Sequence, residues 1–409
     1  MKQRHILFVT STNLSTNPRC FKEIQLAVQN GFRASLLAFS LPGWSKKFES
    51  GYIAELGLED FTYLSAERRP FFPWLISSLL EKASKIIYKI GIRPASVVAI
   101  ALSKRAWLMN RFLKKYQGKP DLVIAHNPPA FYPVAQFAKR TGVKYAIDVE
   151  DYHPGEGTDR DIHQYMILMM KKSFPHASYI SFAAPLIQKK LIALLRDYVP
   201  NVNYLLTVNN IFPSKNFSLS GKATVKNDMR IQFVWFSQNI DADRGLESLL
   251  QVMDHFEQTI ELTLIGNPVP EFVDNWIQNR SYVHIIPPLR ASELYASLSS
   301  YDIGLALETS TEENRKYCLA NKIWAYFQSG LFILATNTLA QEQFLKEYKN
   351  HGFVCENKEE SYSKAIGWIM DHIIQIRNER TKRFEEARSI GWENERRKLE
   401  SKWREVLAN

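Results

Sequence analysis

Short apolar runs of strand type alternate with amphipathic helical segments along the first half of the chain. A polar loop over 11–19 and a helix to about Asn30 join the first two runs, and a helix over 130–140 precedes a later one. Continuous apolar strands separated by helices are typical of a parallel sheet that is covered on both faces. The pattern therefore predicts a doubly wound α/β domain. The predicted strands cover 5–10, 34–39, 121–125, 144–149, 179–182 and 204–208.

The same alternation restarts in the second half, after a polar segment without periodicity. Residues 209–227 carry Pro213 and Gly221 among Asn, Ser and Lys, so we expect a linker there. Strands are predicted at 230–236, 260–265 and 283–286, with a helix over 244–256. The fold class is therefore α/β with two tandem Rossmann-like domains, 1–208 and 228–385. The charged segment that follows, 386–409, is predicted to be a C-terminal helix and is a candidate to cross back to the first domain, with Trp392 and Trp403 as packing anchors.

The segment 301–336 shows a strand, a polar loop, a helix and a second strand. Residues 302–307 are apolar, 308–317 are rich in Glu, Asn, Arg and Lys, and 321–327 are amphipathic, with Gly330 at the expected helix C-cap. The polar loop thus lies between the carboxyl end of a buried strand and the start of a helix. Ligands bind there in open α/β sheets, and a helix N-terminus favours anions.

Length and cysteine content limit the class of protein. A chain of 409 residues is too long for one ordinary domain. The apolar run near the N-terminus is too short for a signal peptide core, and no apolar segment approaches the length of a membrane span. Three widely separated cysteines, Cys20, Cys318 and Cys355, favour a reducing compartment with buried thiols. These features predict a cytoplasmic protein.

The formal net charge of +10 is concentrated in one helical window, residues 66–120. That window holds twelve Lys and Arg against Glu67 and Glu81, a difference equal to the excess of the whole chain. Its basic residues are interleaved with aromatic and aliphatic ones, which suggests contact with an anionic membrane surface. Two ordinary amphipathic helices with solvated Lys faces would give the same composition. No nucleic-acid-binding motif accompanies the charge, so we expect no nucleic acid partner.

Four segments of the chain carry recognisable motifs. They are Asn17-Pro18-Arg19 with Lys22-Glu23 and Gly31, the sequence DVEDY at 148–152, the sequence FVWFSQNIDADRG at 233–245, and Asn321-Lys322 with Tyr326 and Gly330. Taken in order, these segments resemble the GT-B glycosyltransferases, particularly the family-four type, and the resemblance extends over nearly the whole chain. Three features depart from it: Ala325 stands where the family has Glu, Glu150 stands where the family has His, and Ser237-Gln238 lacks the Arg or Lys that many relatives have there.

The resemblance implies a nucleotide-sugar donor in the second domain. Cleavage of the sugar–diphosphate bond builds negative charge on the phosphate, and fixed cations stabilise that charge. Arg244, Lys322 and Arg315 are the candidate cations, and because they supply the charge we expect no metal and no cofactor. Acidic residues of the polar loop are candidates to bind sugar hydroxyls, although solvated acids are the plainer interpretation. The remaining donor-binding candidates are Glu308, Glu312, Glu313, Asn321 and Tyr326.

The resemblance places the acceptor in the first domain, where Asp148, Glu150, Asp151 and His153 lie at the end of the strand predicted at 144–149. In an inverting enzyme one carboxylate would deprotonate the acceptor hydroxyl; Asp151 is the first choice and Glu150 the second. In a retaining enzyme these residues would only orient the acceptor, and a loop capped by its own carboxylates is a third interpretation. The acceptor-binding candidates are Asn17, Arg19, Asp148 and His153.

Metal and dinucleotide motifs fit poorly. The acidic and His residues of 153–163 have no recognised ligand spacing, and the D-x-D tripeptides at 159–161 and 241–243 occur often by chance. Asp243, just before a predicted helix, is better explained as an N-cap. No G-x-G-x-x-G or P-loop sequence is present.

The sequence thus predicts a glycosyltransferase that moves a sugar from a nucleotide-sugar donor to a lipid-linked or polysaccharide acceptor. We expect it in the cytoplasm, as a peripheral protein on the inner face of the plasma membrane. Two alternatives share the architecture: a nucleotide-sugar epimerase, which needs no acceptor, and a non-catalytic GT-B-like partner subunit, which the Ala325 departure favours.

Overall fold

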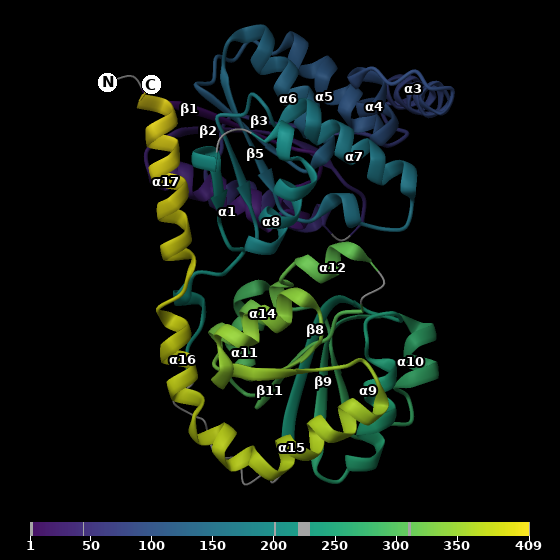
Figure 1. Cartoon of the computed structure of the whole chain (residues 1–409), viewed down its shortest axis with the longest axis vertical. Coiled ribbons are helices and arrows are strands. Elements are labelled where there is room, and N and C mark those ends of the chain that lie inside the picture. The colour runs from purple at the N-terminus through teal and green to yellow at the C-terminus, as the bar shows by residue number, and fades with distance from the viewer. Residues whose placement is uncertain (1–2, 44, 200–201, 220–229, 310–311, 409) are drawn as a thin grey trace. The chain divides into compact units, whose positions relative to one another are not determined.

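A computed structural model describes residues 3–43, 45–199, 202–219, 230–309 and 312–408. The chain divides into two compact units. Unit 1 comprises Met1–Asn209 and Arg396–Asn409, and unit 2 comprises Asn210–Glu395. Each unit is built on its own parallel sheet (Figure 1).

Unit 1 contains a seven-stranded sheet in the order β3-β2-β1-β4-β5-β6-β7, with every neighbouring pair parallel. Strands β1, β4 and β6 are entirely buried, as expected for strands covered on both faces. Because β2 and β4 both flank β1, the strand order reverses beside β1. The strands are β1 (His5–Thr10), β2 (Arg33–Ser40), β3 (Phe61–Ser65), β4 (Leu122–His126), β5 (Lys144–Val149), β6 (Tyr179–Phe182) and β7 (Leu205–Thr207).

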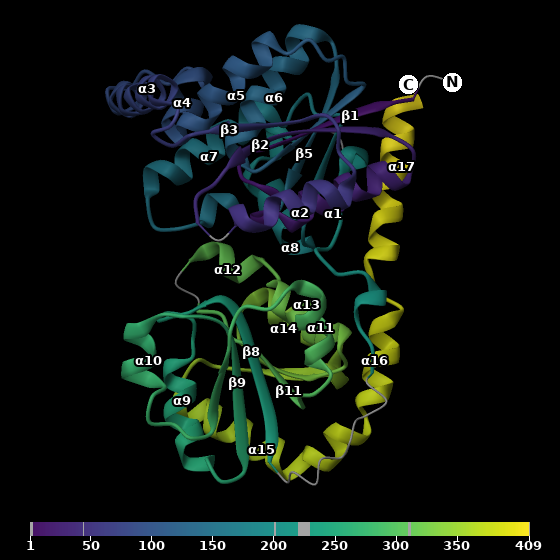
Figure 2. The same ribbon diagram turned by 180° about the vertical axis from the view of Figure 1, so that it is seen from behind.

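Helices cover both faces of this sheet. Figures 1 and 2 show α5, α6 and α7 along one side and α1 and α2 along the other. The basic window 66–120 contributes three helices, α3 to α5, where the sequence suggested two. The helices of unit 1 are α1 (Pro18–Gln29), α2 (Lys46–Leu56), α3 (Phe71–Lys89), α4 (Ala95–Leu102), α5 (Lys104–Lys115), α6 (Pro128–Thr141), α7 (Arg160–Ser173) and α8 (Pro185–Leu194).

Unit 2 contains a six-stranded parallel sheet in the order β10-β9-β8-β11-β12-β13. Its order reverses beside β8, in the same way as beside β1. The strands are β8 (Ile231–Ile240), β9 (Ile260–Pro268), β10 (Val283–Ile286), β11 (Ile303–Ala306), β12 (Phe332–Thr336) and β13 (Gly352–Cys355). Its helices are α9 (Glu247–Met253), α10 (Pro270–Trp276), α11 (Ala291–Leu298), α12 (Glu313–Tyr317), α13 (Asn321–Gln328), α14 (Leu339–Glu347), α15 (Glu359–Asn378) and α16 (Arg380–Arg388).

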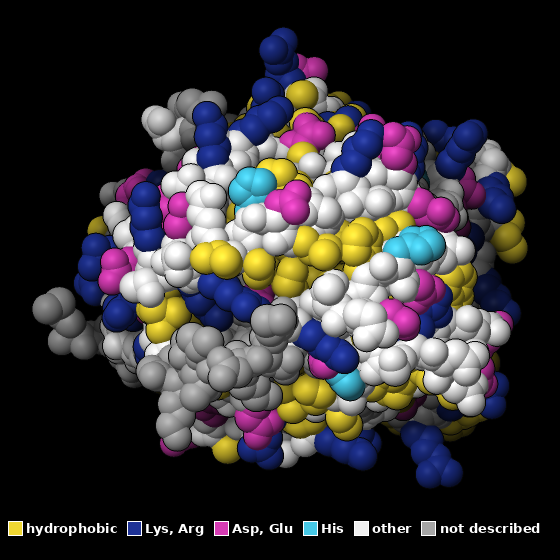
Figure 3. All heavy atoms as spheres, turned by 90° about the horizontal axis from the view of Figure 1, so that it is seen from below, with side chains coloured by type: hydrophobic (Ala, Val, Ile, Leu, Met, Phe, Trp, Pro, Cys, Tyr) yellow, Lys and Arg dark blue, Asp and Glu magenta, His cyan; other side chains and the backbone are white. Residues whose placement is uncertain are grey.

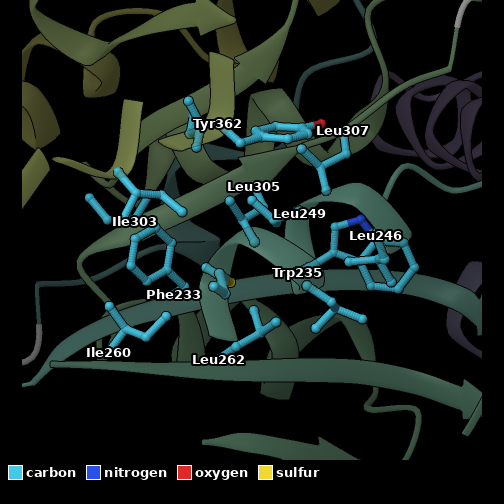
Figure 4. Packing of buried hydrophobic residues seen from close by; sticks show 14 of the residues in the cluster. Phe233, Trp235, Leu246, Leu249, Ile260, Leu262, Ile303, Leu305, Leu307 and Tyr362 are labelled. Atoms are coloured by element: carbon cyan, nitrogen blue, oxygen red, sulfur yellow. The ribbon is translucent and has the colours of Figure 1, made fainter. Parts of the chain in front are cut away.

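The sheet of unit 2 separates two hydrophobic layers. One layer joins the strands to α9, α10 and α15, and it contains Trp235, Leu246 and Leu307 close together (Figure 4). The other joins them to α11, α13 and α14 and contains Tyr326 and Phe344. A sheet packed on both faces explains why its strands are continuous apolar runs.

The C-terminal helix α17 (Trp392–Ala408) ends on unit 1, since residues from Arg396 onward belong to that unit. Trp403 is fully buried, and its indole N–H donates a 2.8 Å hydrogen bond to the hydroxyl of Tyr179. Phe8 and Phe32 pack edge-on against the Trp403 ring. The helix therefore returns to the first domain and is fixed there by Trp403.

The predicted linker, 209–227, only partly behaves as one. Its first residues pack in unit 2, where Ile211 and Phe217 are buried against Tyr295. Residues 220–227 lie outside the described part of the chain. Among the helices of the described residues, none combines the length and the apolar content needed to cross a bilayer.

Candidate functional site

The site in unit 1 is built on a row of polar residues at the carboxyl ends of adjacent strands. Thr10 pairs with His126, His126 with Asp148, and Asp148 with Ser181. In-register residues of a parallel sheet point to the same face, so these four side chains lie beside one another. The row crosses the point where the strand order reverses, between β1 and β4. Open α/β sheets bind ligands there.

Arg19 holds the centre of this row from helix α1. Its Nε and Nη2 donate to the two carboxylate oxygens of Asp148 at 2.5 and 2.7 Å, and its Nη1 donates to the carbonyl of Val208 at 2.6 Å. Ser181 donates a further hydrogen bond to Asp148. Burial alone would raise the pKa of Asp148, but the Arg19 guanidinium holds it well below its usual range. Arg19 and Asp148 are almost fully buried. They therefore stabilise the residues of the site and are not accessible to an acceptor.

His126 lies among acidic groups and has no exposed surface. Its Nδ1 is 3.1 Å from Oε1 of Glu150 and 3.5 Å from Asp148, and its Nε2 is 3.5 Å from Glu23. Burial would lower the pKa of His126, but nearby Cys20, Glu23 and the hydrogen bond to Asp148 raise it well above its ordinary value. The neighbouring acidic groups therefore favour the protonated form of His126.

Glu150 is the acidic residue of this network that reaches the surface, with 15% of its side chain exposed. The amide of Asn17 donates to its Oε1 at 2.6 Å, and the amide of Asn127 lies 3.4 Å from its Oε2. Asn17 also caps α1, because its Oδ1 accepts the N–H of Cys20. The start of α1 therefore fixes the orientation of Glu150. Its weakly bonded Oε2 is the oxygen available to take a proton from a bound hydroxyl.

The next two candidates lie just beyond this network. Asp151 is half-buried and follows Glu150 directly. His153 begins a short 3-10 helix (His153–Gly155) and is buried, with its Nδ1 3.1 Å from Glu156. Burial would lower the pKa of His153, but attraction to Glu156 raises it to about 9. His153 is therefore paired with Glu156 within its own loop.

His126, Asp148 and Glu150 also bring three potential metal-ligand atoms within 4.8 Å of one another. Two observations argue against a cation there. Both oxygens of Asp148 already accept hydrogen bonds from Arg19. Moreover, the buried guanidinium of Arg19 would repel an added cation. The donor set therefore suits a network of protein cations better than a metal ion.

A depression of about 700 Å³ adjoins the loop before α1. Glu49 of α2 borders it and binds that loop, accepting the N–H groups of Leu14 and Ser15 at 2.8 and 3.2 Å. Tyr63 of β3 donates a further hydrogen bond to Glu49. The depression therefore has a fixed wall beside the residues that lead to Asn17. Most of its lining is apolar, including Leu41, Ile53, Leu58 and Phe61.

The site in unit 2 begins at the turn after β8. Gly245 adopts a φ of +79°, and a Cβ there would lie 3.2 Å from the Cβ of Leu307, so a larger residue would displace the neighbouring strand end. Arg244 is half-buried in this turn, and no ion pair or side-chain hydrogen bond involves it within the described residues. The predicted helix start at Arg244 is wrong, since α9 begins at Glu247. Asp243 is not an N-cap either: its N–H donates to Glu247, and its φ is positive.

Glu308, directly after β11, binds two basic side chains. Its Oε1 is 3.2 Å from Nζ of Lys322, and its Oε2 is 3.6 Å from Nη1 of Arg315. The Glu308 backbone exchanges two hydrogen bonds with the hydroxyl of Thr336, at 2.8 and 2.9 Å. Arg315 also donates to Thr309. Helices α12 and α13 thus bring one cation each to the carboxylate of Glu308, whose backbone is fixed by Thr336 of β12.

Helix α13 directs its N-terminus to this cluster. Its N-cap is Ala320, which has no side chain able to satisfy the first N–H groups. Lys322 is in the first turn, with its ammonium 5.2 Å from the ring centre of Trp235. Asn321 is exposed and accepts a hydrogen bond from Asn210. Free N–H groups beside an ammonium and a guanidinium form a site suited to an anion.

Two donor-binding candidates have different positions. Glu313 is the first residue of α12 and is exposed. Tyr326 is fully buried under Gly304, where a Cβ would come within 2.3 Å of the Tyr326 ring, and it packs edge-on against Phe236. The side chain of Tyr326 is therefore part of the core. Its position supports a role in packing instead of the predicted contact with the donor. Ala325 is also fully buried.

Sequence reasoning missed His126, Glu23, Trp235 and Thr336. His126 ends β4 and precedes Asn127 and Pro128, so the rule that singled out Asp148, a polar residue at a strand end, applies equally to it. Glu23 and Trp235 lie in segments that carry the family resemblance, and Glu23 follows Arg19 by four residues on α1, but no site role was assigned to them. Thr336 reaches the site only through tertiary packing.

No protein-family model matches the chain, and a search of curated proteins also gave no match. Solved structures match its fold over nearly its whole length. Sucrose-phosphate synthase from Thermosynechococcus elongatus has a TM-score of 0.70 at 12% identity, covering 99% of this chain and 100% of that chain. HepE from Anabaena, in complex with UDP, has a TM-score of 0.66 at 11% identity, covering 97% and 98%. A UDP-N-acetylglucosamine 2-epimerase has a TM-score of 0.55 at 10% identity, covering 97% and 94%.

The chain therefore has the GT-B fold of nucleotide-sugar glycosyltransferases, with two Rossmann-like units. Nucleotide-sugar epimerases share this fold, so the likeness by itself leaves the reaction open.

Proposed function

We propose that this chain is a glycosyltransferase of the family-four type that takes a sugar from a nucleotide-sugar donor. One observation carries the proposal: Lys322 and Arg315 converge on Glu308 at the uncapped start of α13. A carboxylate between two cations marks a position where negative charge is stabilised. A donor diphosphate would take over part of that charge, and Glu308 would then be free to accept hydrogen bonds from sugar hydroxyls.

Roles for the other residues of unit 2 follow from their positions. Arg244, without an ion-pair partner in the described residues, is available for a second phosphate contact. Asn321 and Glu313 flank Lys322 and Arg315 and would contact donor hydroxyls. Because three side-chain cations supply the charge, we infer that the transfer needs no metal.

In unit 1, Glu150 is the base that the geometry favours. Its Oε1 is fixed by Asn17 and lies beside His126, whereas its Oε2 has one weak hydrogen bond. Asp151, which the sequence ranked first, is the second candidate. Arg19, Asp148 and His126 hold Glu150 in place, and His153 shapes the adjoining loop.

We further propose that the acceptor is a lipid-linked glycan or polysaccharide at the cytoplasmic face of the membrane. The basic helices of the window 66–120 and the apolar depression beside Glu49 support this assignment. We assign residues 1–208 to an acceptor-binding domain, residues 228–385 to a donor-binding domain and residues 386–409 to the C-terminal helix.

A thermal-shift screen against nucleosides, nucleoside diphosphates and nucleotide sugars tests the donor proposal. A ligand at 100 times its dissociation constant stabilises the folded state by about 2.7 kcal/mol. We expect stabilisation by at least one diphosphate and its sugar, and none by the nucleoside alone at the same concentration. No response to any diphosphate would contradict the proposal and favour a non-catalytic subunit.

The second candidate function is a nucleotide-sugar epimerase, which the structural likeness to such an enzyme supports. Incubation of the stabilising nucleotide sugar without acceptor separates the two. Proton NMR would show a new sugar epimer for an epimerase, whereas a transferase leaves the sugar unchanged apart from slow hydrolysis.

A further inference from the structure

Helix α3 presents a continuous apolar stripe to solvent. Successive members are spaced by three or four residues, so they lie on one face of the helix. Phe72 is 73% exposed, and Ile90 at the other end is 68% exposed. The stripe, called the α3 stripe below, consists of Phe72, Ile76, Leu79, Ala83, Ile86 and Ile90, all exposed.

The opposite face of α3 is the one that packs against the protein, and it is the more polar face. Its buried residues are Ser77, Ser84 and Tyr88, which lie toward α4 and α5. A helix on the surface of a soluble domain normally has the reverse arrangement, with apolar residues inward. The inverted polarity of α3 therefore has no explanation in the packing of unit 1.

The exposed apolar residues of the molecule are also concentrated here. Of sixteen exposed large hydrophobic residues in the described part of the chain, seven fall within 71–92. Single exposed apolar residues are ordinary, but a contiguous group marks an interaction surface. The exposed apolar group on α3 is therefore a candidate interaction surface.

The charged residues around the α3 stripe indicate what kind of surface it contacts. Lys82 and Lys89 are exposed on one flank of the α3 stripe, and Arg68, Arg69 and Arg93 are exposed just beyond its two ends. Two acids fall in this region, and one of them, Glu81, is already paired with Lys85 at 2.7 Å. The half-buried Trp74 lies under the guanidinium of Arg68 and the ammonium of Lys104. An apolar stripe with a basic border matches an anionic lipid surface.

We propose that α3 lies in the plane of an anionic bilayer, with the α3 stripe among the upper acyl carbons and the basic border at the lipid headgroups. The helix cannot span the bilayer. A second copy of this chain is a poorer occupant, because pairing two such helices would bring like-charged borders together. The surface depends on neither donor nor acceptor chemistry, so it stands or falls apart from the proposed transferase activity.

A second exposed surface supplies a control. Helix α15 carries Trp368 and Ile374, which are 42% and 74% exposed. Figure 3 views the molecule from below, the side on which α15 lies in Figure 1. Hydrophobic side chains reach the surface there too, in a band bordered by side chains of both charges. Apolar exposure without a basic border should not select an anionic bilayer.

Flotation of the full-length protein with vesicles tests the proposal, using phosphatidylcholine alone or mixed with phosphatidylglycerol, without any nucleotide sugar. We expect binding to the anionic vesicles that weakens as salt rises. Phe72→Ser with Ile86→Ser should lower the partition coefficient about tenfold for each side chain. Lys82→Gln with Lys89→Gln should lower it about fivefold for each charge. The matched controls, Trp368→Ser with Ile374→Ser and Lys346→Gln with Lys349→Gln, should bind as the unchanged protein does.

A site-specific probe gives an independent readout. An environment-sensitive fluorophore on Ala83→Cys should shift to the blue with anionic vesicles, whereas the same fluorophore on Ile374→Cys should not. Both variants carry Cys318→Ser, because Cys318 is the native cysteine of intermediate exposure. Equal partition into both vesicle types at low salt would overturn the proposal. So would a self-associating protein that becomes monomeric with Phe72→Ser and Ile86→Ser and never binds vesicles, since the stripe would then be a protein interface.

Discussion

Arg19 and Asp148 form a bidentate ion pair that joins helix α1 to the end of strand β5, although 129 positions separate them in the sequence. Both are almost completely buried, so neither charge is stabilised by water. Removing one partner leaves the other charge buried without compensation, which costs about 3–5 kcal/mol. We therefore expect Arg19→Met to lower the free energy of unfolding by that amount in urea titrations.

A double variant separates the charge effect from the loss of packing. Arg19→Met with Asp148→Leu removes both charges and should recover part of the lost stability, because buried ion pairs are often replaceable by apolar residues of similar size. Stability in the double variant equal to the sum of the two single losses would show that the pair is not coupled.

Arg244, in the turn after β8, and Lys322, in the first turn of α13, should bind the donor diphosphate. Loss of one charge-assisted contact costs about 1.5–3 kcal/mol, so alanine at either position should weaken binding of a nucleoside diphosphate roughly 10- to 150-fold. Nucleoside binding should change little, because a nucleoside lacks the phosphates that these cations are proposed to contact. Calorimetric titration of both ligands against each variant provides the measurement. Lys346→Ala, on the exposed surface of α14, is the matched control, and equal losses for both ligands would indicate misfolding.

The three proposed donor-binding cations also predict that the transfer reaction does not depend on a metal ion. If Arg244, Lys322 and Arg315 stabilise the leaving diphosphate, transfer should continue at an unchanged rate in excess EDTA. The check is the initial rate of nucleoside diphosphate release before and after chelation. Loss of activity with EDTA and its recovery with manganese or magnesium would instead support the D-x-D tripeptides as metal ligands.

The sequence predicted most of the fold because strands buried on both faces are nearly continuous apolar runs. It missed β3 and β13, which lie at sheet edges. Phe61 of β3 is 44% exposed, and Gly352 opens the four-residue β13. Such short, half-covered strands differ little in composition from a loop.

Site residues could be predicted from the sequence where their positions depend on local structure. They could not be predicted where their positions depend on packing between distant segments. Glu150 directly follows a strand, and Lys322 lies in the first turn of a helix. Both positions can be recognised from the neighbouring residues in the sequence. Glu23 lies on α1, and its approach to His126 depends on the packing of α1 against the sheet. No spacing in the sequence encodes that approach. The exposed side of α3 is a similar case, since composition showed a basic and apolar window but not which face the protein covers.

Glu150 and Asp151 make different predictions as the general base. Glu150→Gln keeps the hydrogen bond from Asn17 but cannot accept a proton, so an inverting enzyme should lose about 10²–10⁴-fold in kcat. The dissociation constant of the donor should stay unchanged, because unit 2 binds it. Asp151→Asn is the comparison: a large loss there with little effect of Glu150→Gln would restore Asp151 as the base. Little effect of either change would indicate a retaining reaction without a base.

The pair of His153 and Glu156 should make stability depend on pH between about 6.5 and 9. The pKa of His153 rises from 6.5 to about 9, because attraction to Glu156 outweighs the lowering by burial. A histidine whose pKa is raised by folding stabilises the protein fully below its unfolded pKa and loses that effect as the pH rises through the folded value. Glu156→Gln should therefore lower the free energy of unfolding by about 1–3 kcal/mol at pH 6 and by almost nothing at pH 10. Urea titrations at pH 6, 8 and 10 measure the difference, and Glu360→Gln, whose fully exposed carboxylate pairs with Lys364, should show no change across this range. A loss that is equal at all three pH values would mean that Glu156 acts through packing and not through the charge of His153.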